Sequence, residues 1–191
     1  MTEKLYIDAQ QLLEDSFRLA ALVYRSGFRP SFIVAVWRGG APMGIAVQEL
    51  MSYRGINADH ITVRTSSYHG IDQQNSVQVF SMNYLVKKLR AEDRLLIVDD
   101  VYDTGRSIEA IIETLGSKTR RNLPEDIRVA VPYYKPSRNM TSRVPDYYLY
   151  ETDQWLKFPH SLEGLSPQEV QDNRPELAKI IAEHHKNEPS R

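Results

Sequence analysis

Apolar and polar positions alternate along this chain in a way that predicts strands and helices in turn. Short apolar runs rich in β-branched residues predict buried strands, and stretches with apolar residues three or four positions apart predict amphipathic helices. Strands are predicted at residues 31–37, 61–65, 77–80, 95–98 and 127–134. Strands that alternate with helices favour the α/β class, in which helices cover both faces of a parallel sheet.

Helices are predicted between these strands, at residues 42–53 and 105–115. An earlier helix opens with Asp8 and Gln11, which have the spacing of a capping box, and ends at Gly27. Its apolar face is expected to include Leu12, Leu13, Phe17, Ala20 and Tyr24.

The last thirty residues carry two further helix signals. Ser166, Pro167 and Glu169 form a favourable helix start, and Pro175 predicts the beginning of a second helix that ends near His185.

Composition narrows the class of protein. A chain of 191 residues suits one domain with a substantial core. Its 24 basic and 25 acidic residues nearly cancel, so no nucleic-acid partner is expected, and the absence of cysteine excludes disulfides and thiolate metal sites. With no signal peptide and no membrane-spanning apolar run, we expect a cytoplasmic protein without a membrane partner.

The most informative segment is residues 95–107. An apolar strand ends in Asp99 and Asp100, and a polar turn from Asp103 to Ser107 then opens a helix. A glycine turn at a helix N-terminus aims N–H groups at one spot and favours a phosphate, whereas adjacent carboxylates accept hydrogen bonds from sugar hydroxyls and can hold hydrated Mg²⁺. The alternative is a plain parallel strand with an acidic exit turn and Asp103 as a helix cap.

A second glycine-rich turn follows the first predicted strand. Arg38, Gly39 and Gly40 precede Pro42, which occupies a favoured early helical position. The spacing does not fit a dinucleotide-binding fingerprint and no Walker lysine follows, so a simple tight turn is the alternative.

Together these segments resemble the type I phosphoribosyltransferases, and residues 95–107 resemble the family's signature for 5-phosphoribosyl-1-pyrophosphate (PRPP). Lys135 and the segment from Trp155 to Pro159 are most similar to the 6-oxopurine (xanthine-guanine and hypoxanthine-guanine) enzymes, over roughly residues 5–160. The resemblance implies a central parallel sheet flanked by helices. It also implies a domain of residues 1–160 with a small base-recognition hood at about 133–160, and a helical extension at 161–191 that is not an independent domain.

The resemblance also implies roles for individual residues. Asp99 and Asp100 would hold the ribose hydroxyls, Asp100 would also reach Mg²⁺, and Asp103 would be the general base. The ribose and 5-phosphate site would further include Asp103, Thr104, Gly105, Arg106 and Ser107.

Two other groups complete the expected site. Pyrophosphate would contact Arg38, Gly39, Ser67 and Tyr68, and the base would contact Lys135, Trp155 and Leu156. Residues 66–81 would form a flexible loop that closes over the site and excludes water, although the stretch alone predicts only an exposed hairpin loop.

The expected function is Mg²⁺-dependent transfer of the phosphoribosyl group from PRPP to guanine, xanthine or hypoxanthine, by a homo-oligomeric enzyme. Two departures bear on base preference: His160 stands where related enzymes often have a second tryptophan, and the chain continues beyond it.

Three alternatives remain open. One is a phosphoribosyltransferase for adenine, orotate or uracil. Another is a non-catalytic PRPP sensor or a nucleic-acid-binding regulator that uses a local basic face. A third is a phosphoryl-transfer protein related to receiver domains. The basic face would be formed by Arg120, Arg121, Arg138 and Arg143.

Overall fold

The computed structural model describes residues 4–67 and 77–185. It divides into two compact units, Gln10–Asp153 and a smaller one made of Met1–Ala9 with Gln154–Arg191. Within the described residues, the larger unit contains a sheet of seven strands in the order β4-β3-β2-β5-β7-β6, with β8 paired to β7. The strands are β2 (Phe32–Trp37), β3 (Asp59–Ser67), β4 (Val77–Phe80), β5 (Arg94–Val98), β6 (Val101–Tyr102), β7 (Asp126–Tyr134) and β8 (Tyr147–Glu151).

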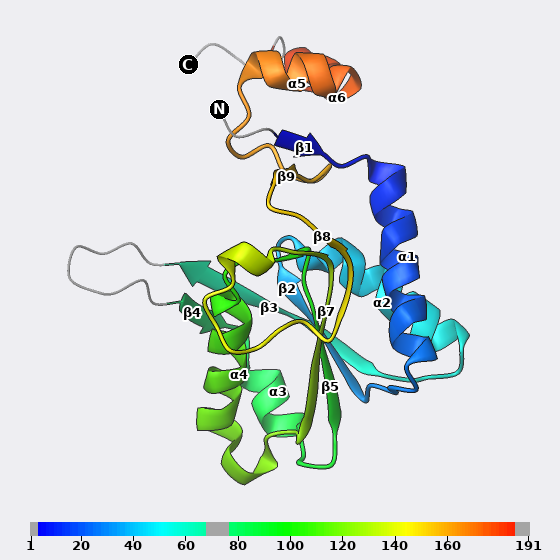
Figure 1. Ribbon diagram of the computed structural model, residues 1–191, viewed down its shortest axis with the longest axis vertical. Coiled ribbons are helices and arrows are strands. Elements are labelled where there is room, and N and C mark those ends of the chain that lie inside the picture. Colours follow the sequence, from blue (N-terminus) through cyan, green and yellow to red (C-terminus); the bar gives the residue numbers. More distant parts are fainter. Residues whose placement is uncertain (1–3, 68–76, 186–191) are drawn as a thin grey trace, which may run out of the picture. The chain divides into compact units, whose positions relative to one another are not determined.

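The sheet is parallel except at its edge, where β4 runs antiparallel to β3. Helices α1 (Ala9–Arg25) and α2 (Gly40–Tyr53) lie on one side of it, and α3 (Asn83–Lys88) and α4 (Arg106–Thr119) on the other (Figure 1). Short 3-10 turns, η1 (Arg120–Asn122) and η2 (Pro136–Arg138), precede and follow β7. The structure thus confirms the predicted α/β class with helices on both faces.

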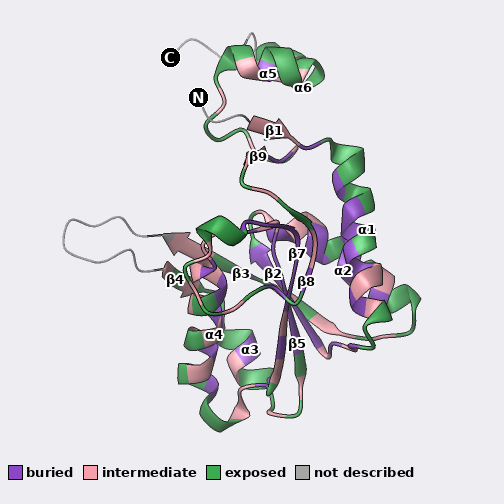
Figure 2. Ribbon diagram, viewed as in Figure 1, coloured by how far each residue is buried: buried purple, intermediate pink, exposed green. Residues whose placement is uncertain are grey.

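The central strands are buried on both faces (Figure 2), which explains their nearly continuous apolar runs. Successive residues of β2 face the helices on opposite sides of the sheet. Val34 belongs to the core cluster that also contains Leu85 of α3 and Ile111 of α4. Ala35 faces α2 so closely that a Cβ on Gly44 would lie 2.5 Å from the Ala35 Cβ.

The predicted apolar face of α1 is partly wrong. Leu13 and Phe17 are exposed, and the buried residues are Leu12, Asp15, Ser16, Leu19, Ala20 and Val23. Two polar residues occupy the buried face, so the spacing of apolar residues alone was misleading. Asp15 is buried because its Oδ1 accepts hydrogen bonds from Gln11, Arg18 and Tyr150.

The smaller unit pairs strand β1 (Lys4–Tyr6) with β9 (Trp155–Lys157) in parallel and ends in helices α5 (Pro167–Asn173) and α6 (Pro175–His185). Both predicted helix starts are confirmed, and Ser166 and Glu169 form a complete capping box. The pairing of β1 with β9 had no counterpart in the sequence patterns. In the described part of the chain, every helix is too short or too polar to cross a membrane.

Candidate active site

Strands β2 and β5 are neighbours in the sheet, and the chain leaves them in opposite directions. From β2 it passes through α2 to β3, and from β5 through α4 to β7 on the other side. In such sheets a crevice opens beyond the carboxyl ends of the two diverging strands and commonly binds ligands. Both segments singled out in the sequence, the Arg38–Gly40 turn and the Asp99–Ser107 turn, lie at this edge.

The strand that carries the paired aspartates is interrupted at them. Strands β5 and β6 keep one register against β7, with Val98 opposite Ala130 and Val101 opposite Tyr133. The Asp99 N–H donates to the Ala130 carbonyl at 3.2 Å. Pro132 has no N–H with which to donate the next hydrogen bond of the ladder. The interruption places Asp99 and Asp100 at the mouth of the crevice.

Asp99 is buried and close to a second carboxylate. Burial raises its pKa well above the usual range, and the charge of Asp100 adds to the rise. Backbone N–H groups of Asp100 and Gly40 donate to the Asp99 carboxylate and oppose that rise, the former at 2.9 Å. A buried carboxylate held by two amides is a fixed hydrogen-bonding group for a ligand hydroxyl.

The glycines of the first turn bring it against the aspartates. A Cβ on Gly39 would lie 2.0 Å from Oδ2 of Asp100, and a Cβ on Gly40 would lie 2.4 Å from the Val98 carbonyl oxygen. A larger residue at Gly40 would separate the two turns, because its Cβ would meet backbone atoms, whereas one at Gly39 would displace the Asp100 side chain. The structure therefore brings together two segments that are sixty residues apart in the sequence.

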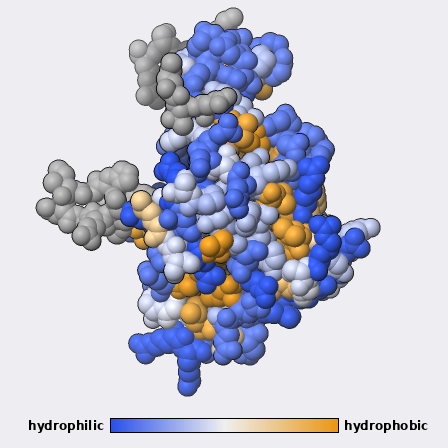
Figure 3. Space-filling view, viewed as in Figure 1, coloured by the Kyte–Doolittle hydropathy of each residue, from blue (hydrophilic) through white to orange (hydrophobic). Residues whose placement is uncertain are grey.

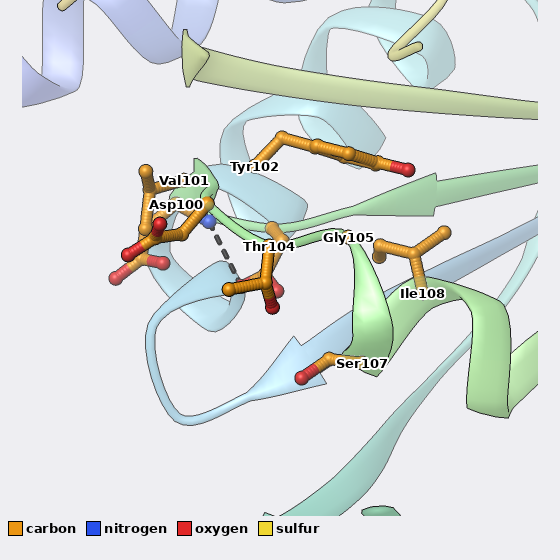
Figure 4. A pocket seen from close by; sticks show the side chains of 9 residues that line it. Asp100, Val101, Tyr102, Thr104, Gly105, Ser107 and Ile108 are labelled. Atoms are coloured by element: carbon orange, nitrogen blue, oxygen red, sulfur yellow. Dashed lines mark hydrogen bonds between the residues drawn. The ribbon is translucent and has the colours of Figure 1, made fainter. Parts of the chain in front are cut away.

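A pocket of about 230 Å³ follows the second turn (Figure 4) and is lined by Asp99, Asp100, Val101, Tyr102, Asp103, Thr104, Gly105, Ser107 and Ile108. Gly105 has φ +78°, a left-handed conformation that favours glycine, and α4 begins at the next residue. Arg106 does not line this pocket.

Both helices at the crevice have a glycine as N-cap residue, Gly39 before α2 and Gly105 before α4, so neither N-cap supplies a side-chain acceptor. The first N–H of α2, at Gly40, donates to Asp99, and the first N–H of α4, at Arg106, donates to Thr104 Oγ1 at 3.5 Å. The first N–H groups of a helix need acceptors from outside it, and its dipole favours negative charge there. The crevice thus has two adjacent places suited to phosphate groups.

A loop after η2 supports the turn from Asp103 to Ser107 through hydrogen bonds. The Tyr102 hydroxyl pairs with Thr141 Oγ1 at 3.0 Å and donates to the Arg143 carbonyl at 3.1 Å. The Met140 N–H donates to the Thr104 carbonyl at 3.0 Å. Sequence reasoning missed this support, because the loop has no periodicity and its hydrogen bonds depend on residues about forty positions away.

Asp103 lies beside two cations from the segment after β7. The Arg138 Nε contacts its Oδ1 at 2.6 Å, in an ion pair that lacks the alignment of a hydrogen bond. Lys135 is only 5% exposed, and its backbone N–H donates to the Tyr102 carbonyl at 2.9 Å. Burial lowers the pKa of Lys135, an effect that Asp103 and Asp153 oppose and Arg138 reinforces. Asp103, which lines the pocket, therefore interacts with both of these cations, neither of which is among the lining residues.

The family model described as "Phosphoribosyl transferase domain" matches residues 5–168. The chain belongs to the phosphoribosyltransferase family. Its architecture agrees with the type I fold expected from the sequence, and the protein is a transferase enzyme.

Individual relatives are distant. A hypoxanthine-guanine phosphoribosyltransferase of Lactococcus lactis is 24% identical over 147 residues, which cover 76% of this chain and 74% of that protein. The purine phosphoribosyltransferase of Pyrococcus horikoshii has a TM-score of 0.65 at 24% identity, and covers 85% of this chain and 97% of its own. A hypothetical protein from Neisseria gonorrhoeae, solved with bound ppGpp, has a TM-score of 0.71 at 18% identity, with coverage of 95% and 98%.

The other expected site residues of this phosphoribosyltransferase are an exposed arginine, residues outside the described part of the chain, and two residues of the smaller unit. Arg38 is exposed and follows a cis peptide bond with Trp37. Tyr68, most of the predicted lid and the Ser67 side chain lie outside the described residues. Trp155 and Leu156 lie on β9 of the smaller unit, where Trp155 is 49% exposed.

The carboxylates fit a shared magnesium ion. Among residues 4–67 and 77–185, no three histidine or carboxylate side chains cluster as a metal cage. Proteins often hold Mg²⁺ through one or two carboxylates while substrate phosphates and waters complete the shell. Asp99 and Asp100 are adjacent oxygen donors, and Asp100 is partly accessible, so they suit an ion that arrives with a phosphate ligand.

Proposed function

We propose that this phosphoribosyltransferase transfers the 5-phosphoribosyl group of PRPP to a 6-oxopurine, forming a purine nucleoside 5′-monophosphate and pyrophosphate in purine salvage. The observation that carries the proposal is the contact of the Gly39–Gly40 turn with Asp99 and Asp100. It gives one crevice the N-termini of two helices, each with a glycine N-cap, beside paired carboxylates. PRPP has phosphate groups at both ends of a diol-bearing sugar, which matches this arrangement.

Different residues of the chain would bind different parts of PRPP. Thr104, Gly105, Arg106 and Ser107 would bind the 5-phosphate at the start of α4, although Arg106 does not line the pocket itself. Asp99 and Asp100 would accept hydrogen bonds from the ribose hydroxyls. The Arg38 guanidinium and the Gly39 amide would hold the pyrophosphate, together with Ser67 and Tyr68.

Bond cleavage at the sugar carbon would develop positive charge on the ribose and negative charge on the departing pyrophosphate. Mg²⁺ bound at Asp100 would supply electrostatic stabilisation of that leaving group. Asp103 would accept the proton of the purine imidazole nitrogen as the glycosidic bond forms. Its ion pair with Arg138 orients the carboxylate at the pocket wall.

The base assignment is supported by Lys135 and by the names of the relatives. Lys135 is nearly buried, and its ammonium interacts with the charge of the pocket residue Asp103. Such an ammonium suits donation to an exocyclic oxygen, and a base that lacks this oxygen would leave it unpaired. Trp155 would stack on the ring, and the Leu156 backbone would contact the base edge. The Lactococcus and Pyrococcus proteins are named as hypoxanthine-guanine and purine enzymes. Cytoplasmic location and homo-oligomerisation stay predictions.

The test is a product assay with PRPP and Mg²⁺ in which guanine, hypoxanthine, xanthine, adenine, orotate and uracil are offered separately. Formation of GMP, IMP or XMP supports the proposal, and their relative rates identify the preferred base. Activity confined to adenine or a pyrimidine would retain the PRPP site and refute the roles of Lys135 and Trp155.

Asp103→Asn tests the general base. The amide keeps the size of the side chain but cannot accept the purine proton, so we expect turnover to fall by about 10²–10⁴-fold while PRPP binding stays near wild type. Turnover equal to wild type would remove Asp103 from this role.

A second candidate function is nucleotide sensing without catalysis. It is favoured by the Neisseria structure, which covers nearly the whole of both chains and holds ppGpp. Measurable binding of PRPP or ppGpp without turnover of any base would support this candidate. A nucleic-acid regulator is less well supported, because Arg138 pairs with Asp103 and Arg143 with Asp146 instead of forming a free basic face.

A further inference from the structure

Strand β9 carries Trp155 and Leu156 but has little regular structure to hold it. Its three residues pair with β1, with Lys4 opposite Trp155 and Tyr6 opposite Lys157. An isolated two-stranded sheet is marginal in water at best. The described part of α5 and α6 adds little apolar burial, since Val170 is the one core residue there and the visible helix surface is mostly hydrophilic (Figure 3). Ile7 and Phe158, which follow β1 and β9, are buried, and the other side-chain contacts that hold β9 in place are polar.

Arg174, between α5 and α6, supplies the densest set of these contacts. Its guanidinium donates to the carbonyls of Phe158 and Ser161, each at 2.7 Å, and to that of Lys157 at 3.3 Å. A contact to the Pro159 carbonyl at 3.5 Å completes the set. The planar arrangement of arginine donors suits several acceptors at once, which a lysine cannot reproduce.

Lys157 fixes the same segment from within. Its ammonium donates to the Glu163 carbonyl at 2.7 Å and lies 5.4 Å from the centre of the Trp155 ring. The side chain is only 5% exposed, and a Cβ on Gly164 would lie 3.2 Å from its Nζ. The turn that leads into α5 therefore encloses the cation next to Trp155.

Strand β1, which pairs with β9, also contacts α5. Glu169 on α5 forms an ion pair with Lys4 and accepts a hydrogen bond from Tyr6 at 3.4 Å. The capping box with Ser166 holds Glu169 in position for both contacts. The C-terminal segment thus contacts both strands of the small sheet.

We propose that residues 166–174 clamp the base-recognition strand, and that Arg174 is the positioning residue of this clamp. The inference rests on the proposed function, because it assigns the C-terminal segment to the part of that site that contacts the purine. Arg174 fixes the backbone that follows Trp155 and Leu156 and need not touch the base itself. Loss of the clamp would weaken binding of the base and leave PRPP recognition unchanged.

The test compares Arg174→Ala with Lys179→Ala in the full-length enzyme. Lys179 is an exposed cation on α6 whose ion pair is with Glu176, so it controls for charge loss in the same segment. We expect Arg174→Ala to raise KM for the preferred purine about tenfold, the scale of a lost charged hydrogen bond, while KM for PRPP and kcat change less than twofold. Lys179→Ala should match wild type in all three.

Hydrogen exchange gives a readout that is independent of activity. Amides of residues 155–161 should exchange faster in Arg174→Ala than in wild type, with those of residues 95–107 unchanged. If the alanine variant does not fold, Arg174→Lys replaces it and should show a smaller rise in the same KM.

The outcomes separate the clamp from the proposed function. An active enzyme in which Arg174→Ala leaves KM for the base unchanged overturns the clamp alone, as does an equal rise in both KM values. A folded wild-type enzyme that converts no purine overturns the proposed function itself.

Discussion

Gly39→Ala isolates the contact that joins the two halves of the proposed PRPP site. A Cβ at this position would lie 2.0 Å from Oδ2 and 2.3 Å from Cγ of Asp100, against an ordinary contact of about 3.4 Å. The backbone at Gly39 has φ −60° and ψ −41°, which alanine adopts without strain. The clash is with a side chain that can rotate, so the carboxylate of Asp100 moves and the fold is retained.

The size of the effect follows from that displacement. The carboxylate must move by roughly 1 Å or more, and misplacement of a catalytic group by this distance costs about 10²-fold in rate. We therefore expect kcat/KM for PRPP to fall by about 10²-fold. The free energy of unfolding should change by less than about 1 kcal/mol, because surface changes without backbone strain are small.

Two other glycines provide matched comparisons. Gly116→Ala in α4 places its Cβ at an ordinary 3.5 Å from Leu123, so activity should be unchanged and stability should rise by up to about 1 kcal/mol. Gly40→Ala places its Cβ 2.4 Å from the Val98 carbonyl and 2.8 Å from the Asp99 Cα, which are backbone atoms, and should destabilise by about 1–3 kcal/mol.

The assay combines initial rates at varied PRPP and fixed Mg²⁺ with urea unfolding of each variant. A Gly39→Ala enzyme with wild-type kcat/KM for PRPP would refute the reasoning, because it would show that the position of Asp100 against this turn is unimportant. A Gly39→Ala enzyme as unstable as Gly40→Ala would show that the clash is not relieved by side-chain rotation.

Two further predictions concern ion pairs. Arg138→Ala should lower kcat about tenfold, because the Asp103 carboxylate loses the ion pair that orients it. The free energy of unfolding should change by less than about 1 kcal/mol, because partly exposed ion pairs contribute little to stability. An unchanged kcat would show that the ion pair has no catalytic role. The Lys4 ammonium lowers the pKa of Glu169 to about 2, so this carboxylate stabilises the fold above its ordinary pKa of 4.5 and loses that contribution as the pH falls towards 2. Urea unfolding of wild type and Glu169→Gln should therefore differ at pH 6 and converge near pH 2, and a pH-independent difference would contradict this assignment.

The sequence was most informative where local chemistry determines structure. Apolar runs located the central strands, because a strand buried on both faces must be apolar throughout. The Asp99–Ser107 segment was also interpretable, since carboxylates, a glycine turn and a helix start follow one another within nine residues. Each of these signals lies within one element and its exit turn.

The features that were missed depend on contacts between distant segments. Arg138 resembles any exposed arginine in the sequence, and its role emerges only because β5 and β7 are adjacent and bring it to Asp103. Pro132 interrupts the ladder at Asp99 only through the register of those strands. On α1, Asp15 is buried because Tyr150, far along the chain, provides a partner. Local patterns carry no information about such partners.

The two halves of the proposed site therefore differ in how tightly the fold constrains them. The PRPP half consists of backbone amides and carboxylates at the divergence of β2 and β5, where Gly39 and Gly40 leave no room for a side chain. The proposed base half depends on β9, which Arg174 contacts directly and which pairs with β1, where Glu169 contacts Lys4. A side chain at Gly40 would disturb the backbone of the sheet edge itself, whereas loss of Arg174 would alter only a small strand pair. Base preference can consequently change through the C-terminal segment while PRPP binding is preserved.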